Sequence, residues 1–380
     1  MRASAPDLLL EHVHDPYPYY SELREHDPVH FDERRGNWLV LRYDDVLTLL
    51  KDETRLSAQQ GTSSSMLNND PPKHTRLRSL VSQAFTPRRV RELAPRIQEI
   101  VDGLLDEAAC KDVMDVIQEF AYPLPITVIA ELLGVEKEHR AMFREVSEST
   151  ALSLGSTTPD PAAAARSMAG NRALLAYFEE LISRRRAEPR DDLVSACILA
   201  EERGDFFTHN ELLAMLQILL VGGHETTANL IGNGLFALLR HPDQLERLRK
   251  EEVGVTAVDE LLRFDSPVQY TGRVAREDFE LRGKTIRAGD GVRMMLGSAN
   301  HDEREFANPT ELDLTRDPCP HLSFGWGVHF CLGAELARLE GNIALTTLVR
   351  RFPNLALADA APMWRAAPVM RGLTSLAVAF

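Results

Sequence analysis

The longest helical pattern in this 380-residue chain constrains its fold more than any other segment. Thr208 and Glu211 have the spacing of a capping box, which opens the helix. His241-Pro242 stops it after about Arg240. Roughly thirty residues at about 1.5 Å each span about 45 Å. Because such a helix crosses a whole domain, the other elements are expected to pack around it.

The rest of the chain predicts a mainly α fold with a small, mostly antiparallel β region. Helical periodicity recurs in the segments 18–24, 44–51, 74–83, 87–108, 125–133 and 166–186. Alternating apolar residues predict a hairpin of 29–31 with 38–41, a second hairpin within 279–286 and a strand within 373–380. No linker or internal repeat divides the sequence, so residues 1–380 are expected to form a single domain.

Cys331 lies in a glycine-rich loop that runs from Phe324 through Gly325 and Gly327 to Gly333. A thiolate can bind iron, and glycines let backbone approach a flat, bulky group or adopt positive φ. Helical spacing resumes at once, so the thiolate would face the positive end of a helix. A lone cysteine is more often a small core hydrophobe. C-x-x-C pairs are absent, which argues against zinc, iron–sulfur and thioredoxin-type sites.

The centre of the long helix contains Gly222 and Gly223, followed by His224, Glu225 and Thr226. Each glycine costs about 1 kcal/mol relative to alanine, which indicates either tight helix packing or close approach of another group. The sequence His-Glu begins the zinc motif H-E-x-x-H. Position 228 is alanine, so that motif is incomplete.

Together these motifs resemble the soluble bacterial cytochrome P450 family of haem-thiolate monooxygenases. The family pattern F-x-x-G-x-x-x-C-x-G matches residues 324–333, and an acid–alcohol pair and an E-x-x-R pair precede it in family order. The resemblance covers nearly the whole chain and implies that the long helix crosses the haem. One departure is Gly222, where alanine is common in the family.

The resemblance implies that Cys331 is the axial ligand of one haem b per chain. Glu225 and Thr226 would deliver the protons that O–O cleavage requires, because a hydroxyl can donate and accept and a carboxylate can relay protons from solvent. Thr227 is expected to serve helix packing. Glu260 and Arg263 would form the structural E-x-x-R pair beneath the haem, although an isolated i,i+3 pair is more often a surface ion pair.

Cofactor and substrate contacts follow from the same resemblance. The expected cofactor-binding residues, four of them facing the haem propionates, are His74, Arg78, Arg273 and His329, with Phe324, Gly325, Cys331 and Gly333 in the loop. The family's specificity segments predict a substrate site formed by Met66, Leu67, Leu219, Gly222, Gly223, Val268, Val369 and Met370. These residues favour a small, largely apolar substrate, such as a natural-product intermediate (macrolide or terpenoid) or a fatty acid.

The expected reaction inserts one oxygen atom from O2 into a C–H bond, by hydroxylation or epoxidation. Since the chain has no flavin or nicotinamide domain, a separate ferredoxin and ferredoxin reductase would supply electrons, with Arg78, Arg88, Arg89 and Arg338 as candidate docking cations. A net charge of −14 argues against nucleic-acid binding. Neither a signal peptide nor a membrane anchor is recognisable, so a cytoplasmic location is expected.

Three alternatives stay open. One is a peroxygenase driven by H2O2 and acting on fatty acids, although such relatives usually lack the acid–alcohol pair. Another is a non-catalytic haem sensor or carrier, which the intact pair and the absence of a signalling domain disfavour. The last is a haemless interaction module, which the retained Cys331 and propionate contacts disfavour.

Overall fold

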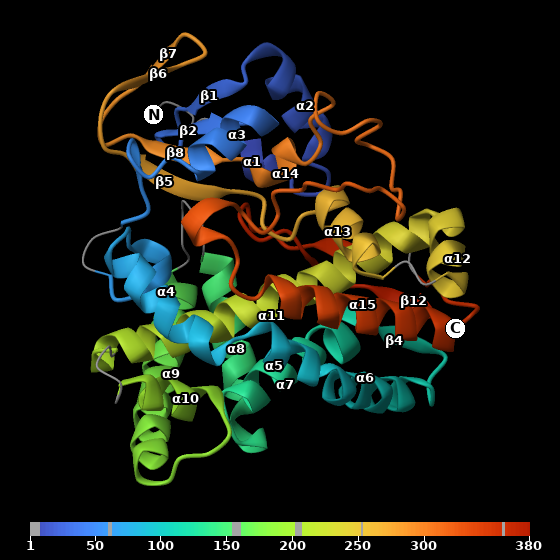
Figure 1. Cartoon of the computed structure of the whole chain (residues 1–380). Coiled ribbons are helices and arrows are strands. Elements are labelled where there is room, and N and C mark those ends of the chain that lie inside the picture. Colours follow the sequence, from blue (N-terminus) through green and yellow to red (C-terminus); the bar gives the residue numbers. More distant parts are fainter. Residues whose placement is uncertain (1–7, 60–62, 154–160, 202–206, 252–253, 359–361) are drawn as a thin grey trace.

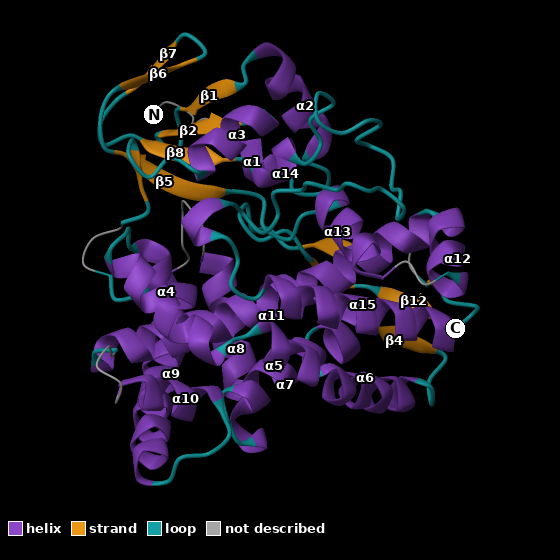
Figure 2. Ribbon diagram, in the orientation of Figure 1, coloured by secondary structure: helices purple, strands orange, loops and turns teal. Residues whose placement is uncertain are grey.

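Helices make up most of the molecule, and the largest sheet lies at one end of it (Figures 1 and 2). The computed structural model describes residues 8–59, 63–153, 161–201, 207–251, 254–358 and 362–380. The helices are α1 (Leu8–Glu11), α2 (Tyr17–His26), α3 (Tyr43–Leu50), α4 (Lys73–Ala84), α5 (Pro87–Glu92), α6 (Ala94–Ala108), α7 (Pro123–Leu132), α8 (Arg140–Ser153), α9 (Pro161–Ala187), α10 (Leu193–Glu201), α11 (His209–Arg240), α12 (Pro242–Lys250), α13 (Gly254–Phe264), α14 (Leu296–Ala299) and α15 (Ala334–Arg351). Shorter helical turns are η1 (Met66–Asn68), the π-helical η2 (Ile117–Ala121), η3 (Lys137–His139) and η4 (Gly327–His329).

The long helix α11 forms as predicted, with 32 residues from His209 to Arg240. The capping box is present, since the Thr208 hydroxyl accepts from the Glu211 N–H and the Glu211 carboxylate accepts from the Thr208 N–H. Helices α7, α8, α9, α13 and α15 pack against it, and Figure 1 shows it running across the middle of the helical region. Among the described helices, none is both long and apolar enough to cross a bilayer.

The strands form small sheets that are mostly antiparallel. They are β1 (Val29–Asp32), β2 (Asn37–Val40), β3 (Leu56–Ser57), β4 (Val113–Asp115), β5 (Thr271–Ala275), β6 (Phe279–Leu281), β7 (Lys284–Ile286), β8 (Gly291–Met294), β9 (Ala356–Leu357), β10 (Met363–Trp364), β11 (Leu373–Ser375) and β12 (Ala377–Ala379). The largest sheet has the order β1-β2-β8-β5-β3, in which β2 and β8 run parallel. Both predicted hairpins form: Val29 pairs with Val40, and Phe279 pairs with Ile286.

Two segments differ from the prediction. The helix predicted over 87–108 is two helices, α5 and α6, that meet at Leu93. Pro95 lies in the first turn of α6, where a missing N–H is tolerated. In the interior of one continuous helix, the same proline would remove a backbone hydrogen bond and clash with the preceding turn. The strand predicted within 373–380 is also two strands: β11 pairs with β10, whereas β12 lies between β4 and β9.

Candidate active site

A cavity of about 1540 Å³, counted with its open mouth, lies between α4, α11, β5 and the loop that precedes α15. Residues far apart in the sequence meet on its walls, because α11 forms one side and the glycine-rich loop forms the other. The predicted site residues that line it are Met66, Leu67, His74, Arg78, Leu219, Gly222, Gly223, Thr226, Val268, Arg273, Phe324, Gly325, His329, Cys331 and Gly333.

Backbone hydrogen bonds hold the Cys331 loop in place. The Cys331 N–H donates to the Phe324 carbonyl at 2.9 Å. Gly325 and Gly327 have φ of 68° and 73°, a region that favours glycine. A Cβ at Gly327 would also lie 3.0 Å from the Leu50 carbonyl oxygen. Gly333 has an ordinary φ and open space where a Cβ would be, so it leaves room beside the thiol.

Cys331 is accessible from the cavity but is otherwise surrounded by protein. Burial raises the pKa of its thiol, and the Gly333 N–H, Arg78 and Arg338 oppose that shift. A metal ion would deprotonate the thiol outright. In the described part of the chain, no cluster of three or more His, Cys, Asp or Glu side chains could hold a metal ion. A single thiolate therefore suits an iron whose other ligands belong to its own macrocycle, as in haem.

One end of the cavity is cationic. The His74 and His329 rings lie 4.2 Å apart between their centroids, and Arg78 and Arg273 line the same end. Within the described residues, neither arginine forms an ion pair with a carboxylate, and His74 Nδ1 is buried without a partner. Burial, with Arg273 and His74 adding to it, lowers the pKa of His329 to about 3. Half-buried arginines without a carboxylate partner favour an anionic ligand, and haem propionates fit this end.

On the α11 wall, Thr226 faces the cavity and its hydroxyl donates to the Gly222 carbonyl at 2.7 Å. A Cβ at Gly222 would meet no atom within 4 Å beyond its own stretch of helix backbone, whereas a Cβ at Gly223 would lie 3.3 Å from the Ile129 side chain. Thr227, which we expected only to pack, also lines the cavity. Of the two central glycines, Gly223 therefore explains close packing and Gly222 leaves space.

Glu225 does not line the cavity. Its side chain is fully buried on another face of α11, where Oε2 lies 2.6 Å from Nη1 of Arg365 and accepts from the Tyr122 hydroxyl at 3.4 Å. Burial raises the pKa of Glu225 to about 8, with the negative charge of Glu148 adding to that shift and the positive charge of Arg144 opposing it. Adjacent residues on a helix point about 100° apart, so Glu225 and its neighbour Thr226 face different surroundings.

The E-x-x-R pair is buried rather than a surface ion pair. Arg263 Nε lies 2.7 Å from Glu260 Oε2, and Nη2 lies 2.8 Å from Oε1. Arg263 also donates to the carbonyls of Asn300, Pro309 and Glu311. Arg316, which was not predicted from the sequence, also contacts this pair, with its Nε 3.0 Å from Glu260 Oε2. Arg316 lies in a loop, where helix spacing gives no signal.

Two predicted substrate residues lie outside the cavity lining. Val369 packs against a small cluster with Tyr20 and Leu39, and Met370 is buried and forms a backbone bridge with Val268. Both residues belong to the loop between β10 and β11, and at these positions their side chains pack into the protein core.

Glu340, which was also not predicted as a site residue, lines the cavity from α15. It is 1% exposed, its Oε2 has no partner, and burial raises its pKa well above the ordinary value. The available signal was its position on the apolar helix face that carries Leu336 and Ala344, at spacings of four residues.

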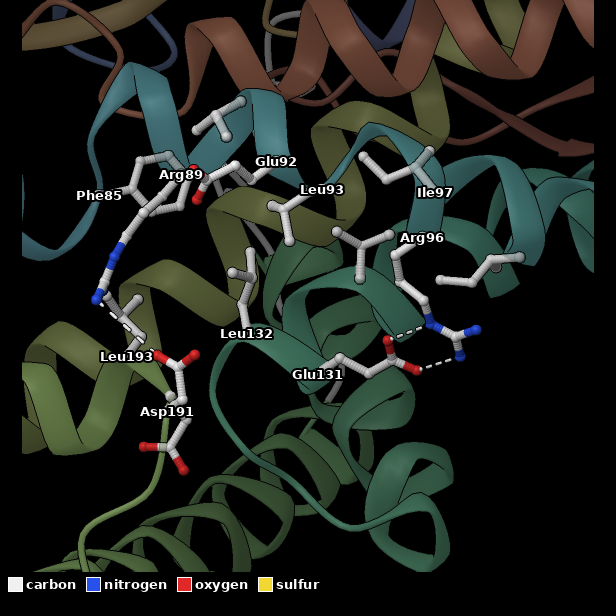
Figure 3. Close-up of a pocket in the computed structure, with 14 residues that line it drawn as sticks. Phe85, Arg89, Glu92, Leu93, Arg96, Ile97, Glu131, Leu132, Asp191 and Leu193 are labelled. Atoms are coloured by element: carbon white, nitrogen blue, oxygen red, sulfur yellow. Dashed lines mark hydrogen bonds and ion pairs between the residues drawn. The ribbon is translucent and has the colours of Figure 1, made fainter.

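A second cavity, of about 970 Å³, lies between α5, α6, α7 and α10 (Figure 3). Arg96 and Glu131 form an ion pair at its edge, with 2.9 Å between Nε and Oε2. The described residues that line it include no cysteine or histidine. Phe85 lines both cavities and so forms part of the wall between them.

The cytochrome P450 family model matches residues 50–359. The chain belongs to the cytochrome P450 family. The cytochrome P450 monooxygenase PikC of Streptomyces venezuelae is 44% identical over 386 residues, covering 96% of this chain and 91% of PikC. The polyketide biosynthesis cytochrome P450 PksS of Bacillus subtilis (strain 168) is 41% identical over 398 residues, covering 97% and 96%. CYP109E1 from Bacillus megaterium, solved in complex with testosterone, superposes with a TM-score of 0.91 at 34% identity, covering 97% and 99%.

This P450 is thus a monooxygenase of bacterial type, and membership of the family implies a haem cofactor and a small-molecule substrate. The predicted fold class is confirmed by the superposition. The single cavity thiol and the cationic end fit that cofactor independently of the comparisons.

Proposed function

We propose that this P450, acting as one domain, oxidises a C–H bond of a small, largely apolar natural-product intermediate, by hydroxylation or epoxidation. The observation that carries the proposal is one cavity in which a single thiol faces apolar walls. Met66, Leu67, Leu219 and Val268 form those walls, and they match a ligand without many polar groups. The polyketide biosynthesis named for PksS and the testosterone bound to CYP109E1 support a substrate of this class.

Cys331 binds the iron of one haem b per chain in this proposal. His74, Arg78, Arg273 and His329 hold the propionates, and Phe324, Gly325 and Gly333 seat the macrocycle. Haem, when bound, supplies O2 binding and redox chemistry. The protein keeps water away from the reacting centre through the apolar walls and positions the substrate between Gly222, Gly223 and Val268.

Thr226 supplies a hydroxyl that can donate and accept hydrogen bonds at the cavity wall. In the proposed mechanism the Thr226 hydroxyl gives up its hydrogen bond to the Gly222 carbonyl and donates to O2 in the cavity instead. Glu225 then returns a proton to Thr226 from the buried side of α11. Glu225 directly precedes Thr226 on α11 but faces another side of the helix, so this step requires its carboxyl to turn toward the cavity.

Electrons would arrive from a ferredoxin and its reductase on the Cys331 side of the molecule. Of the candidate docking cations, Arg78 lines the cavity, while Arg338 pairs with Asp259 at 2.7 Å and Arg88 pairs with Glu92 at 2.9 Å. Because the proposed docking is electrostatic, association with the ferredoxin is expected to weaken as the salt concentration rises.

The test is the spectrum of the reduced protein with CO, followed by turnover. Wild-type protein is expected to give the red-shifted band of a thiolate-ligated haem, and Cys331→Ser is expected to lose it. A histidine-type band in the wild type would refute the ligand assignment. Thr226→Ala should divert electrons into peroxide or water, with Thr227→Ala as the matched neighbour. Product formed with H2O2 but never with a redox partner would identify a peroxygenase instead.

A further inference from the structure

The loop between β10 and β11 fastens one wall of the cavity through its backbone. The Gln269 N–H donates to the Val369 carbonyl at 2.8 Å. The Arg371 N–H donates to the Pro267 carbonyl, also at 2.8 Å. Between these two hydrogen bonds, Val268 forms an antiparallel bridge with the same loop. Since Pro267 and Val268 line the cavity, this short ladder determines where that part of the wall lies.

The side chain of Arg371 joins this loop to two other segments of the chain. Its Nε lies 2.6 Å from Oδ1 of Asp265, the residue that follows α13. Its Nη1 donates to the Val13 carbonyl, and its Nη2 donates to the His14 carbonyl at 3.2 Å. The guanidinium carbon lies 3.6 Å from the centroid of the Trp364 ring. One side chain therefore connects the loop to the end of α13 and to the segment between α1 and α2.

Asp265 receives hydrogen bonds from both sides of this contact. Tyr17, in the first turn of α2, donates its hydroxyl to the same Oδ1 atom at 2.8 Å. The Tyr17 ring also stacks on the His301 ring, with 4.1 Å between centroids. The side chains of Asp265 and Arg371 are 9% and 5% exposed, so their ion pair is shielded from solvent and its geometry is well defined. We call the group of Tyr17, Asp265 and Arg371 the Arg371 clasp.

Arginine suits the centre of this clasp, because its guanidinium presents five donors in a rigid fork. With one carboxylate and two carbonyls as partners, the orientation of the fork is fixed. The backbone of Arg371 is held from another side as well, since its carbonyl accepts from Asn233 Nδ2 of α11 at 3.1 Å. A shift of the Arg371 side chain would therefore be passed through its backbone to Pro267 and Val268.

We propose that Arg371 is a positioning residue for the substrate, because the Arg371 clasp fixes the cavity wall at Pro267 and Val268 and thereby sets how well a ligand fits. The inference rests on the proposed function, in which Val268 contacts the substrate. Arg371 itself does not line the cavity, so it acts through the wall and not by touching the ligand. Coupling of this kind typically changes affinity by about 5–150-fold.

The first experiment compares two ligands that both bind haem iron through an imidazole nitrogen. Imidazole itself is too small to test the walls, whereas clotrimazole carries three aromatic rings that need them. In spectral titrations of the holoenzyme, Arg371→Met should raise the Kd of clotrimazole at least about fivefold and that of imidazole less than about twofold. An unchanged clotrimazole Kd, or equal weakening of both ligands, would overturn the proposal.

Arg371→Lys provides a milder variant. Lysine retains the charge toward Asp265, but its compact ammonium cannot reproduce the fork that meets the carboxylate and two carbonyls. The ratio of the clotrimazole Kd to the imidazole Kd should therefore lie between those of wild type and Arg371→Met. If Arg371→Met does not retain haem, this ratio in Arg371→Lys decides the question, and a wild-type ratio would overturn the proposal.

The matched control is Arg185, another buried arginine that pairs with an aspartate. The side chains of Arg185 and Asp192 are both 4% exposed, and neither residue lines the haem cavity. Arg185→Met should therefore lower the free energy of unfolding without changing the ratio of the two Kd values. A change in the ratio equal to that in Arg371→Met would overturn the proposal, because it would show a general effect of losing a buried ion pair.

The second experiment measures amide hydrogen exchange in the holoenzyme without added ligand. Arg371→Met should speed exchange in residues 13–20 and 265–271 together, because the Arg371 clasp joins them, and Arg185→Met should not. Unchanged exchange in both segments would overturn the proposal. The proposed function fails in a different way: a wild-type enzyme that shows the expected exchange and Kd ratios but forms no oxidised product would refute that function alone.

Discussion

Replacement of Arg263 by Met tests how strongly burial decides the value of an ion pair in this P450. Arg263 and Glu260 are both 0% exposed, and the guanidinium donates to Glu260 and to three backbone carbonyls. Methionine retains part of the volume but leaves those carbonyls without a donor. Removing one partner of a buried pair costs about 3–5 kcal/mol. Since a domain has only about 5–15 kcal/mol of stability, a large part of it should be lost.

The control has similar contact geometry on the surface. Arg88 Nε lies 2.9 Å from Glu92 Oε1, compared with 2.7 Å between Arg263 Nε and Glu260 Oε2, but Arg88 is 85% exposed. Arg88→Met should therefore cost at most about 0.5 kcal/mol. Urea unfolding followed by circular dichroism at fixed haem content measures both free energies. If Arg263→Met costs less than about 1 kcal/mol, matching the surface pair, then burial is not what gives the E-x-x-R pair its role.

Three further predictions concern buried or cavity-facing positions. Glu340→Gln should be more stable than wild type at pH 7, because the buried native carboxyl keeps its proton while the unfolded chain loses it above about pH 4.3. The free energy of unfolding of the wild type should therefore fall, relative to the variant, by up to about 1.4 kcal/mol per pH unit. Parallel pH profiles of unfolding for the two proteins would contradict this prediction. Gly222→Ala should raise the free energy of unfolding by about 1 kcal/mol, since its Cβ meets open space, and should also reduce the room for large ligands. Unfolding measures the first effect and spectral titration with ligands the second. Gly223→Ala is the control, because a Cβ there would meet the Ile129 side chain. Gly327→Ala should lower the free energy of unfolding by about 1–2 kcal/mol, because φ is 73° and the Leu50 carbonyl oxygen blocks the Cβ. The variant should release haem at a lower temperature on heating, and unchanged haem retention would rule this prediction out.

Local signals explain what could be predicted from the sequence. The capping box at Thr208 and the stop at His241-Pro242 act within a few residues, and α11 begins and ends where they indicate. The glycine pattern around Cys331 likewise encodes a loop whose backbone is specified locally, with Gly325 and Gly327 in the left-handed region. The residues expected to face the haem then meet in one cavity, because α4, β5 and this loop converge there.

Long-range pairs could not be predicted in the same way. Arg316 contacts Glu260 across 56 residues, and Arg365 contacts Glu225 across 140, with no periodic spacing to mark either pair. The family resemblance suggested an acid beside Thr226, but it did not indicate that Glu225 would be buried away from the cavity. Val369 lies outside the cavity lining for a related reason: an apolar loop residue can face either a ligand or the core, and the sequence does not distinguish the two.

The position of β12 between β4 and β9 has a consequence for synthesis of the chain. Ser375 and Asp115, which hydrogen-bond where this sheet meets β11, are 260 residues apart. At about 5–20 residues per second, a ribosome needs roughly 13–50 s to make the intervening segment. During that interval β4 has neither its β12 partner nor the cover that this strand provides. The nascent chain therefore carries an unpaired strand edge for most of its translation, and chaperone contacts at residues 113–115 are where co-translational protection would matter most.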